Sequence, residues 1–179
     1  MKGIVFTEFL AMVEDRFTAD TVDDIIDDAD LPSGGAYTSV GTYPHSEMVS
    51  LVVSLSKVTG LPVPALIQSF GEHLFGRFSH LYPAFFAEKQ DAFSFMESIE
   101  GHIHVEVRKL YPEAELPTFA TERNGDQLIM TYSSKHAFAK LAEGLVTGCL
   151  AYFREKATIT AEDLSGGVGN HTRFYIQKA

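Results

Sequence analysis

Cysteine and tryptophan are nearly missing from this sequence of 179 residues, which has one cysteine, Cys149, and no tryptophan. A single cysteine cannot form a disulfide within the chain, so a fold held together by disulfides is excluded. A lone thiol is also typical of proteins that stay in a reducing compartment. We therefore expect a cytoplasmic protein.

Basic residues are scarce as well. The chain has 14 Lys and Arg residues against 24 Asp and Glu residues, which gives a formal net charge of -10. Affinity for nucleic acids depends mainly on clustered Lys and Arg side chains. We therefore expect no DNA or RNA partner.

Long apolar runs are also lacking. The first segment, Met1–Phe6, consists mostly of apolar residues. The acidic residues Glu8, Glu14 and Asp15 follow before a signal-peptide core or a membrane span could form. We expect a soluble protein that is neither exported nor inserted in a membrane.

The composition is otherwise that of an ordinary globular protein with many aromatic side chains. Hydrophobic residues make up 45% of the chain, which includes 14 Phe and 7 Tyr. A chain of this length can bury a substantial core and usually forms one domain. The sequence therefore predicts a single domain over residues 1–179.

Helical spacing dominates the first 110 residues. A stripe of apolar side chains predicts an amphipathic first helix and consists of Phe6, Phe9, Leu10, Val13 and Phe17. A second, short helix is expected over residues 20–29, with Asp20 or Thr21 as its N-cap. Three further helices are predicted over residues 45–59, 64–80 and 91–110. Tyr111-Pro112 would end the last of them.

After Pro117 the pattern becomes that of β strands. Asn124-Gly125 stands between two strand-like runs and is a strong signal for a hairpin turn. The predicted elements are strands over residues 118–123, 127–132, 157–160 and 173–176 and a helix over residues 136–156. Helices followed by an antiparallel sheet predict an α+β fold.

Two histidines, His102 and His104, suggest a metal chelate at first sight. On a helix, a separation of two residues corresponds to a rotation of roughly 200°, so the two imidazoles point in nearly opposite directions. They cannot bind one ion together. At most one of them faces a pocket, and the two residues alone do not decide whether it is a ligand or a structural side chain.

The residues after His104 form a longer motif. They give the run His-x-x-Val-x-x-x-Tyr-Pro-x-Ala-x-x-Pro-x-Phe from His104 to Phe119. This run resembles the haem nitric oxide/oxygen-binding family, H-NOX or HNOB, which includes the sensor domain of soluble guanylate cyclase. Other similarities follow in the family's order, at Met1–Val5, Gly71-x-x-x-Phe75, Tyr82-Pro83, Glu143-Gly144-Leu145 with Gly148, and His171-x-x-Phe174-x-Ile176.

The resemblance implies a cofactor and a domain arrangement. In the family, the histidine at the place of His104 ligates the haem iron, and the proline at the place of Pro117 presses on the porphyrin and distorts it. One haem b would be held between a distal helical part, residues 1–63, and a proximal part, residues 64–179. The proximal part would contain a helix and a four-stranded antiparallel sheet.

The family's propionate-binding motif, Tyr-x-Ser-x-Arg, aligns with residues 132–136. Tyr132 and Ser134 match, but His136 stands where the family has arginine. A guanidinium offers a carboxylate a permanent charge and two parallel hydrogen bonds, whereas the charge of an imidazole depends on pH and on nearby anions. The neighbouring Lys135 could supply the missing charge. The resemblance therefore implies a haem site whose propionate contacts differ from those of the family.

The choice of gas depends on the distal side of the haem, because iron-bound dioxygen is held better by a hydrogen-bond donor. Oxygen-binding members of the family have a tyrosine where this chain has Leu141, and some have an asparagine where it has Leu74. The rest of the expected apolar pocket is formed by Val5, Phe9, Phe78 and Leu145. We therefore expect a ferrous site that binds nitric oxide and carbon monoxide and binds dioxygen weakly or not at all.

The family's behaviour also implies a switch. Nitric oxide would weaken the bond from the iron to His104, which would let the porphyrin flatten against Pro117 and shift the N-terminal helices. A member without an output domain must signal through another protein. By resemblance to bacterial relatives, the expected partner is a histidine kinase or a cyclic-di-GMP synthase or phosphodiesterase.

Two other classes of protein remain as alternatives. A haem enzyme, such as a peroxidase, would need a distal His or Arg as general acid, and the apolar distal set speaks against it, so we expect no catalysis. A haem-free interaction module with the same fold would explain the departure at His136. Redox sensing by Cys149 lacks a neighbouring cation in the sequence that would activate the thiol.

Overall fold

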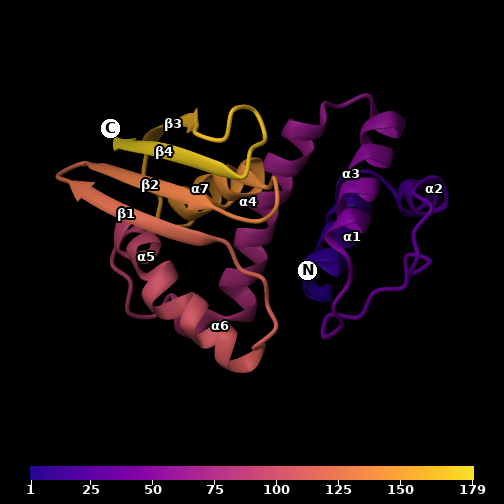
Figure 1. Cartoon of the computed structure of the whole chain (residues 1–179), viewed down its shortest axis with the longest axis horizontal. Helices are drawn as coiled ribbons and strands as arrows, with labels where there is room; N and C mark the ends of the chain where they lie inside the picture. Colours follow the sequence, from indigo (N-terminus) through magenta and orange to yellow (C-terminus); the bar gives the residue numbers. More distant parts are fainter. The chain divides into compact units, whose positions relative to one another are not determined.

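The computed structural model describes all 179 residues, and they form two compact units, Met1–Phe70 and Gly71–Ala179. The first unit contains three complete helices, α1 (Gly3–Arg16), α2 (Ala19–Asp28) and α3 (His45–Thr59), and the start of α4 (Val63–Leu81). The second contains the rest of α4, the other helices and the whole sheet (Figure 1).

The first unit is built around the apolar stripe of α1. Phe6, Phe9, Met12 and Val13 are fully or almost fully buried, which confirms the predicted amphipathic helix. The predicted N-cap of the second helix is wrong, because the hydroxyl of Thr18 accepts a hydrogen bond from the amide of Thr21 at 3.1 Å. A Thr hydroxyl one residue before the helix satisfies an amide that the helix leaves without a partner.

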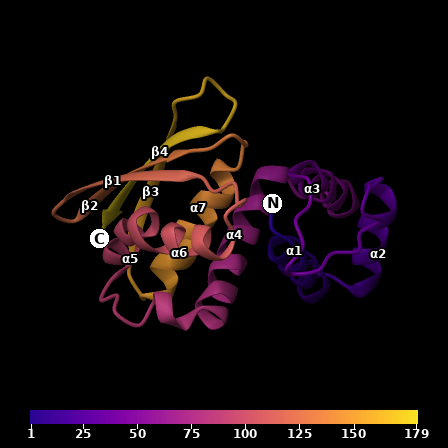
Figure 2. The ribbon, with the colours of Figure 1, turned by 60° about the horizontal axis from the view of Figure 1, so that its bottom comes forward.

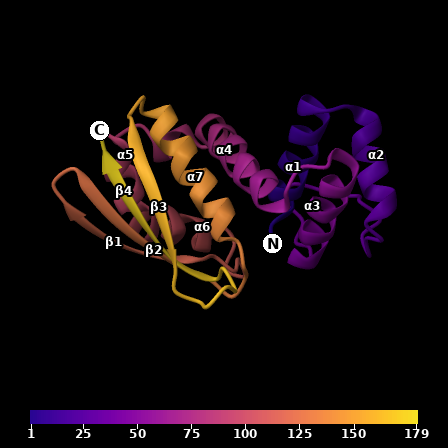
Figure 3. The same cartoon turned by 90° about the horizontal axis from the view of Figure 1, so that it is seen from above.

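The second unit contains the predicted four-stranded antiparallel sheet. Its strands are β1 (Thr118–Asn124), β2 (Gln127–Ser133), β3 (Ala157–Asp163) and β4 (His171–Lys178), in the spatial order β1-β2-β4-β3. The hairpin turn lies at Gly125 and Asp126, one residue later than predicted, with Asn124 paired to Gln127. Gly125 has a φ of 59°, which glycine adopts without strain. This turn and the β3–β4 connection lie at opposite ends of the sheet (Figure 3).

Helices cover one face of this sheet (Figure 2). Alternate residues of β2 and β4 are buried beneath α5 (Ala92–Ser98) and α7 (Ala139–Tyr152). Helices α4 and α7 pack closely, since a Cβ at Gly71 would lie 2.4 Å from the carbonyl oxygen of Leu141. Only glycine permits that approach. The glycine at position 71 is therefore explained by helix packing.

The predicted long helix over residues 91–110 is interrupted. A π-helical turn, Ile99–Ile103, separates α5 from α6 (His104–Leu110). The amide of His104 donates its hydrogen bond to the carbonyl of Ile99, five residues earlier. π turns inside helices occur frequently at functional sites. Residues 91–110 thus form two short helices joined directly before His104.

No single helix is long and apolar enough to span a membrane, and only the pair α3 and α4, bent by 114°, meets that criterion of length and composition together.

Asp91 anchors the start of α5 to the sheet. Its side chain accepts a hydrogen bond from the amide of Ser94 at 2.6 Å and lies 3.4 Å from both Arg123 of β1 and Lys178 of β4. Burial alone would raise the pKa of the Asp91 carboxyl. The hydrogen bonds of Ser94 and the charge of Lys178 outweigh that effect and lower the pKa to about 2, from its usual 3.8.

Replacing Asp91 should destabilise the fold in a pH-dependent way. Because its pKa is lower in the folded chain, the carboxylate stabilises the fold fully above pH 3.8 and progressively less as the pH falls toward 2. Asp91→Ala should lower the free energy of unfolding by about 1–2 kcal/mol at neutral pH. Urea unfolding at neutral pH and near the lowered pKa checks this, with the exposed Glu88→Ala as control. An equal deficit at both pH values would contradict the assignment.

Candidate functional site

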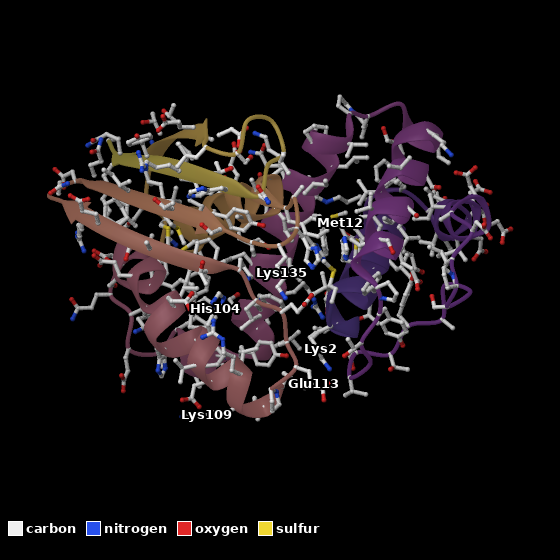
Figure 4. The ribbon with its side chains drawn as sticks, viewed as in Figure 1. Lys2, Met12, His104, Lys109, Glu113 and Lys135 are labelled. Carbon is white, nitrogen blue, oxygen red and sulfur yellow. The ribbon has the colours of Figure 1, made fainter.

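The two histidines of the sequence motif lie in different environments. His104 begins α6 and is 8% exposed, whereas His102 lies on the surface and packs edge-on against Phe85 at a centroid distance of 5.9 Å. The two imidazoles are therefore not arranged to bind one ion together. Figure 4 shows His104 between α6 and the sheet.

A carboxylate that the sequence analysis missed lies beside His104. The side chain of Glu100, in the π turn, accepts a hydrogen bond from Nδ1 of His104 at 3.1 Å. It also accepts hydrogen bonds from the guanidinium of Arg108 at 3.0 Å and from the amide of Phe119 at 3.2 Å. The four-residue spacing of Glu100 and His104 was a signal, because residues so spaced are neighbours on a helix.

This environment favours a neutral His104. Burial lowers the pKa of its imidazole, against the opposing effect of the Glu100 carboxylate. Burial would raise the pKa of Glu100, but the hydrogen bonds from Arg108, the Phe119 amide and His104 lower it. With Nδ1 as donor to an ionised carboxylate, Nε2 carries the lone pair. A neutral imidazole with one free lone pair is a good metal ligand.

Two aromatic rings, those of Phe119 and Tyr132, connect His104 to the β sheet. The ring of Phe119 lies 5.8 Å from that of His104 and 5.7 Å from that of Tyr132, centroid to centroid. Pro117 precedes Phe119 by two residues and is half-buried. The structure thus brings together His104 and Tyr132, which lie 28 residues apart in the sequence.

The segment after β2 forms a tight turn around His136. The hydroxyl of Tyr132 donates to the carbonyl of His136 at 3.0 Å, and the hydroxyl of Ser134 accepts from the amide of His136 at 3.1 Å. The amide of Ser134 donates to the carbonyl of Asn170 at 2.9 Å, in the loop before β4. Tyr132 and Ser134 therefore fix the backbone of the residue that stands in place of arginine.

A pocket of about 340 Å³ lies against this turn. Its lining includes both basic and acidic side chains and consists of Arg108, Pro112, Glu113, Ala114, Glu115, Leu116, Ser134, Lys135 and His136. The carboxylate of Glu115 lies 3.0 Å from Nζ of Lys135 and 3.2 Å from Nε2 of His136. These hydrogen bonds lower the pKa of Glu115. Lys135 and His136 therefore act together on one carboxylate group.

Most of the predicted apolar residues belong to the second unit. Leu74 is buried on α4, and Phe78 follows it by one turn and packs against Tyr82 at a centroid distance of 5.9 Å. Leu141 and Leu145 are half-buried on α7, where the chain contacts Gly71. In the first unit, Val5 is half-buried, and Phe9 is fully buried against Phe70.

Cys149 lies in the core of the second unit. Its side chain is 1% exposed, and burial raises the pKa of the thiol. A thiol is reactive mainly as the thiolate, so this environment disfavours redox chemistry at Cys149.

Comparisons with known proteins point to one family. The profile of the family described as haem-NO-binding, HNOB, matches residues 2–161. No match was found among curated proteins.

Several solved structures are similar along the whole chain. The Fe(II) unliganded H-NOX protein from K. algicida is 42% identical, with 100% of this chain and 97% of that chain covered and a TM-score of 0.94. The IWP-051-bound H-NOX from Shewanella woodyi in the Fe(II)CO state is 40% identical, with coverage of 100% and 95% and a TM-score of 0.85. An H-NOX protein from S. oneidensis in the Fe(II)NO state is 26% identical, with coverage of 100% and 99% and a TM-score of 0.92.

Removing the hydroxyl of Tyr132 should loosen the turn at His136. Tyr132→Phe keeps the ring but loses the hydrogen bond to the His136 carbonyl, which should cost about 1 kcal/mol of unfolding free energy. Urea unfolding measures this loss, and Tyr152→Phe, at a half-exposed ring, is the matched control. Equal stabilities of Tyr132→Phe and the unmodified chain would show that the hydrogen bond contributes nothing to the turn.

Proposed function

The chain belongs to the haem-NO-binding (H-NOX) family, whose members are haem-based gas sensors, and we propose that it senses nitric oxide through a ferrous haem b bound to His104. H-NOX domains bind haem and act as sensor domains rather than as enzymes. The observation that carries the proposal is the buried imidazole of His104, held neutral with Nδ1 donating to Glu100. That arrangement leaves Nε2 as the iron ligand.

The side chains of the second unit fit the chemistry of haem. The porphyrin is largely apolar, and Pro117 and the half-buried leucines Leu141 and Leu145 are suited to contact it. Its propionates are carboxylates, and Lys135 and His136 already hold the Glu115 carboxylate at one rim of the pocket. We propose that these two residues, with Tyr132 and Ser134, provide the propionate-binding end of the site.

The gas preference follows from the side chains expected on the distal side. When bound, ferrous haem supplies an open coordination position for a diatomic gas. Leu74 and Leu141 carry no hydrogen-bond donor, so they cannot stabilise the charge that dioxygen acquires on iron. Val5, Phe9, Phe78 and Leu145 add no donor either. We therefore propose that nitric oxide and carbon monoxide bind and that dioxygen is excluded.

A change at His104 must be transmitted to the surface of the protein by contacts between residues of this chain. His104 is linked through Glu100 to the amide of Phe119, and thus to the start of β1. A movement of His104 away from this position would therefore alter the hydrogen bonding of Glu100, which also accepts a hydrogen bond from the start of β1. We propose that a separate cytoplasmic protein detects this change, either a histidine kinase or an enzyme that makes or breaks down cyclic-di-GMP.

Spectra of the reconstituted ferrous protein test the ligand assignment. We expect a histidine-ligated spectrum that changes with nitric oxide and carbon monoxide and not with air. His104→Gly should lose it and regain it on addition of imidazole, whereas His102→Gly, at the exposed histidine, should leave it unchanged. No Soret band would refute haem binding, a stable complex in air would refute the gas preference, and peroxide turnover would favour an enzyme.

The rate of haem loss tests the propionate assignment. His136→Arg introduces a permanent charge with two parallel donors, which should slow haem transfer to excess apomyoglobin by roughly tenfold. His171→Arg makes the same change at an exposed histidine at the start of β4 and should have no effect. Unchanged or faster haem loss from His136→Arg would place the propionates elsewhere.

A further inference from the structure

The Glu100 carboxylate accepts hydrogen bonds from three groups, which belong to two elements of the second unit, α6 and β1. They come from the imidazole of His104 at 3.1 Å, the guanidinium of Arg108 at 3.0 Å and the backbone amide of Phe119 at 3.2 Å. Oε1 accepts from Arg108, and Oε2 accepts from the other two. The carboxylate is therefore held in one orientation by groups that do not depend on His104.

That fixed carboxylate constrains the imidazole in two ways. Its hydrogen bond to Nδ1 selects the tautomer in which Nε2 bears the lone pair, and it restrains rotation of the ring. A carboxylate acceptor also makes an imidazole a stronger electron donor toward a metal. The ring of Phe119 lies 5.8 Å from that of His104 and flanks the imidazole, while the backbone amide of Phe119 donates to the same carboxylate.

Resting on the proposed haem-sensor function, we propose that Glu100 is the positioning residue that sets the orientation and the strength of His104 as the iron ligand. Arg108 and the amide of Phe119 are the groups that keep Glu100 in place. Glu100 itself does not touch the iron. Its effect passes entirely through Nδ1 of His104.

The same contacts connect the ligand to two other parts of the site. The Phe119 amide belongs to β1, two residues after Pro117, and Arg108 lines the pocket that contains Lys135 and His136. A displacement of His104 removes one of the three donors to Glu100 and leaves the carboxylate with only Arg108 and the amide of Phe119 as donors. Glu100 thus couples the ligand to the sheet and to the propionate-binding end.

The test replaces the carboxylate and keeps its shape. Glu100→Gln retains one acceptor oxygen but loses the charge. Glu106→Gln makes the same change on α6, at a carboxylate that forms an ion pair with Lys109. In the ferrous haem-bound protein, Glu100→Gln should lower the iron–histidine stretching frequency in the resonance Raman spectrum. It should also speed the loss of His104 from iron after addition of nitric oxide by roughly tenfold. Glu106→Gln should change neither.

A second measurement uses the haem-free protein. Hydrogen exchange of the Phe119 amide should be roughly fivefold faster in Glu100→Gln than in the unmodified chain, because its acceptor is weakened. Glu100→Asp, which keeps the charge on a shorter side chain, should give a stretching frequency between those of Glu100→Gln and the unmodified protein. If Glu100→Gln does not fold, Glu100→Asp alone provides the comparison with the unmodified protein.

The outcomes separate the two proposals. If the unmodified protein shows no iron–histidine stretch, the proposed function fails, and the role of Glu100 fails with it. If the stretch is present and unchanged in both Glu100 variants, His104 remains the ligand and the positioning role alone is overturned. A lowered stretch in Glu100→Gln with an unchanged Glu106→Gln supports the role.

Discussion

The hydrogen bond from Nδ1 of His104 to the Glu100 carboxylate is the contact on which the arrangement of the candidate site depends. It joins Glu100 in the π turn to His104 at the start of α6, and β1 presents the Phe119 amide to the same carboxylate. A buried imidazole without such a partner would leave a polar group without a hydrogen bond, which is costly. Burial keeps the imidazole of His104 neutral, and the carboxylate keeps it oriented.

Much of the fold was predictable because periodicity and turn residues act locally. The stripe from Phe6 to Val13, the strand alternation around Met130 and the Gly-containing hairpin all predicted their elements, and the α+β fold is confirmed. The π turn at Ile99–Ile103 was not predictable, because a single turn of this kind is too short to leave a distinct pattern of apolar residues in the sequence. The exact cap and turn positions also depend on single hydrogen bonds rather than on a pattern.

The site was predictable only in part, because some of its contacts also depend on single hydrogen bonds rather than on a sequence pattern. The motif from His104 to Phe119 pointed to the ligand, and it also contained Arg108, whose partner Glu100 lies just before it. Nothing in the motif shows that one carboxylate receives hydrogen bonds from two side chains of α6 and from a backbone amide of β1. In contrast, the exchange of arginine for His136 was visible at once. The structure adds that Lys135 and His136 share one carboxylate, Glu115, so an ammonium group and an imidazole stand where the family has one guanidinium.

The proposed iron ligation depends on two atoms of one side chain, Nε2 and Nδ1 of His104. A crystal structure of the ferrous, haem-bound protein tests both together. We expect Nε2 of His104 to ligate the iron while Nδ1 still donates to the Glu100 carboxylate, which in turn still accepts from the amide of Phe119. An iron ligated by any other residue, or a Glu100 side chain turned away from His104, would contradict it.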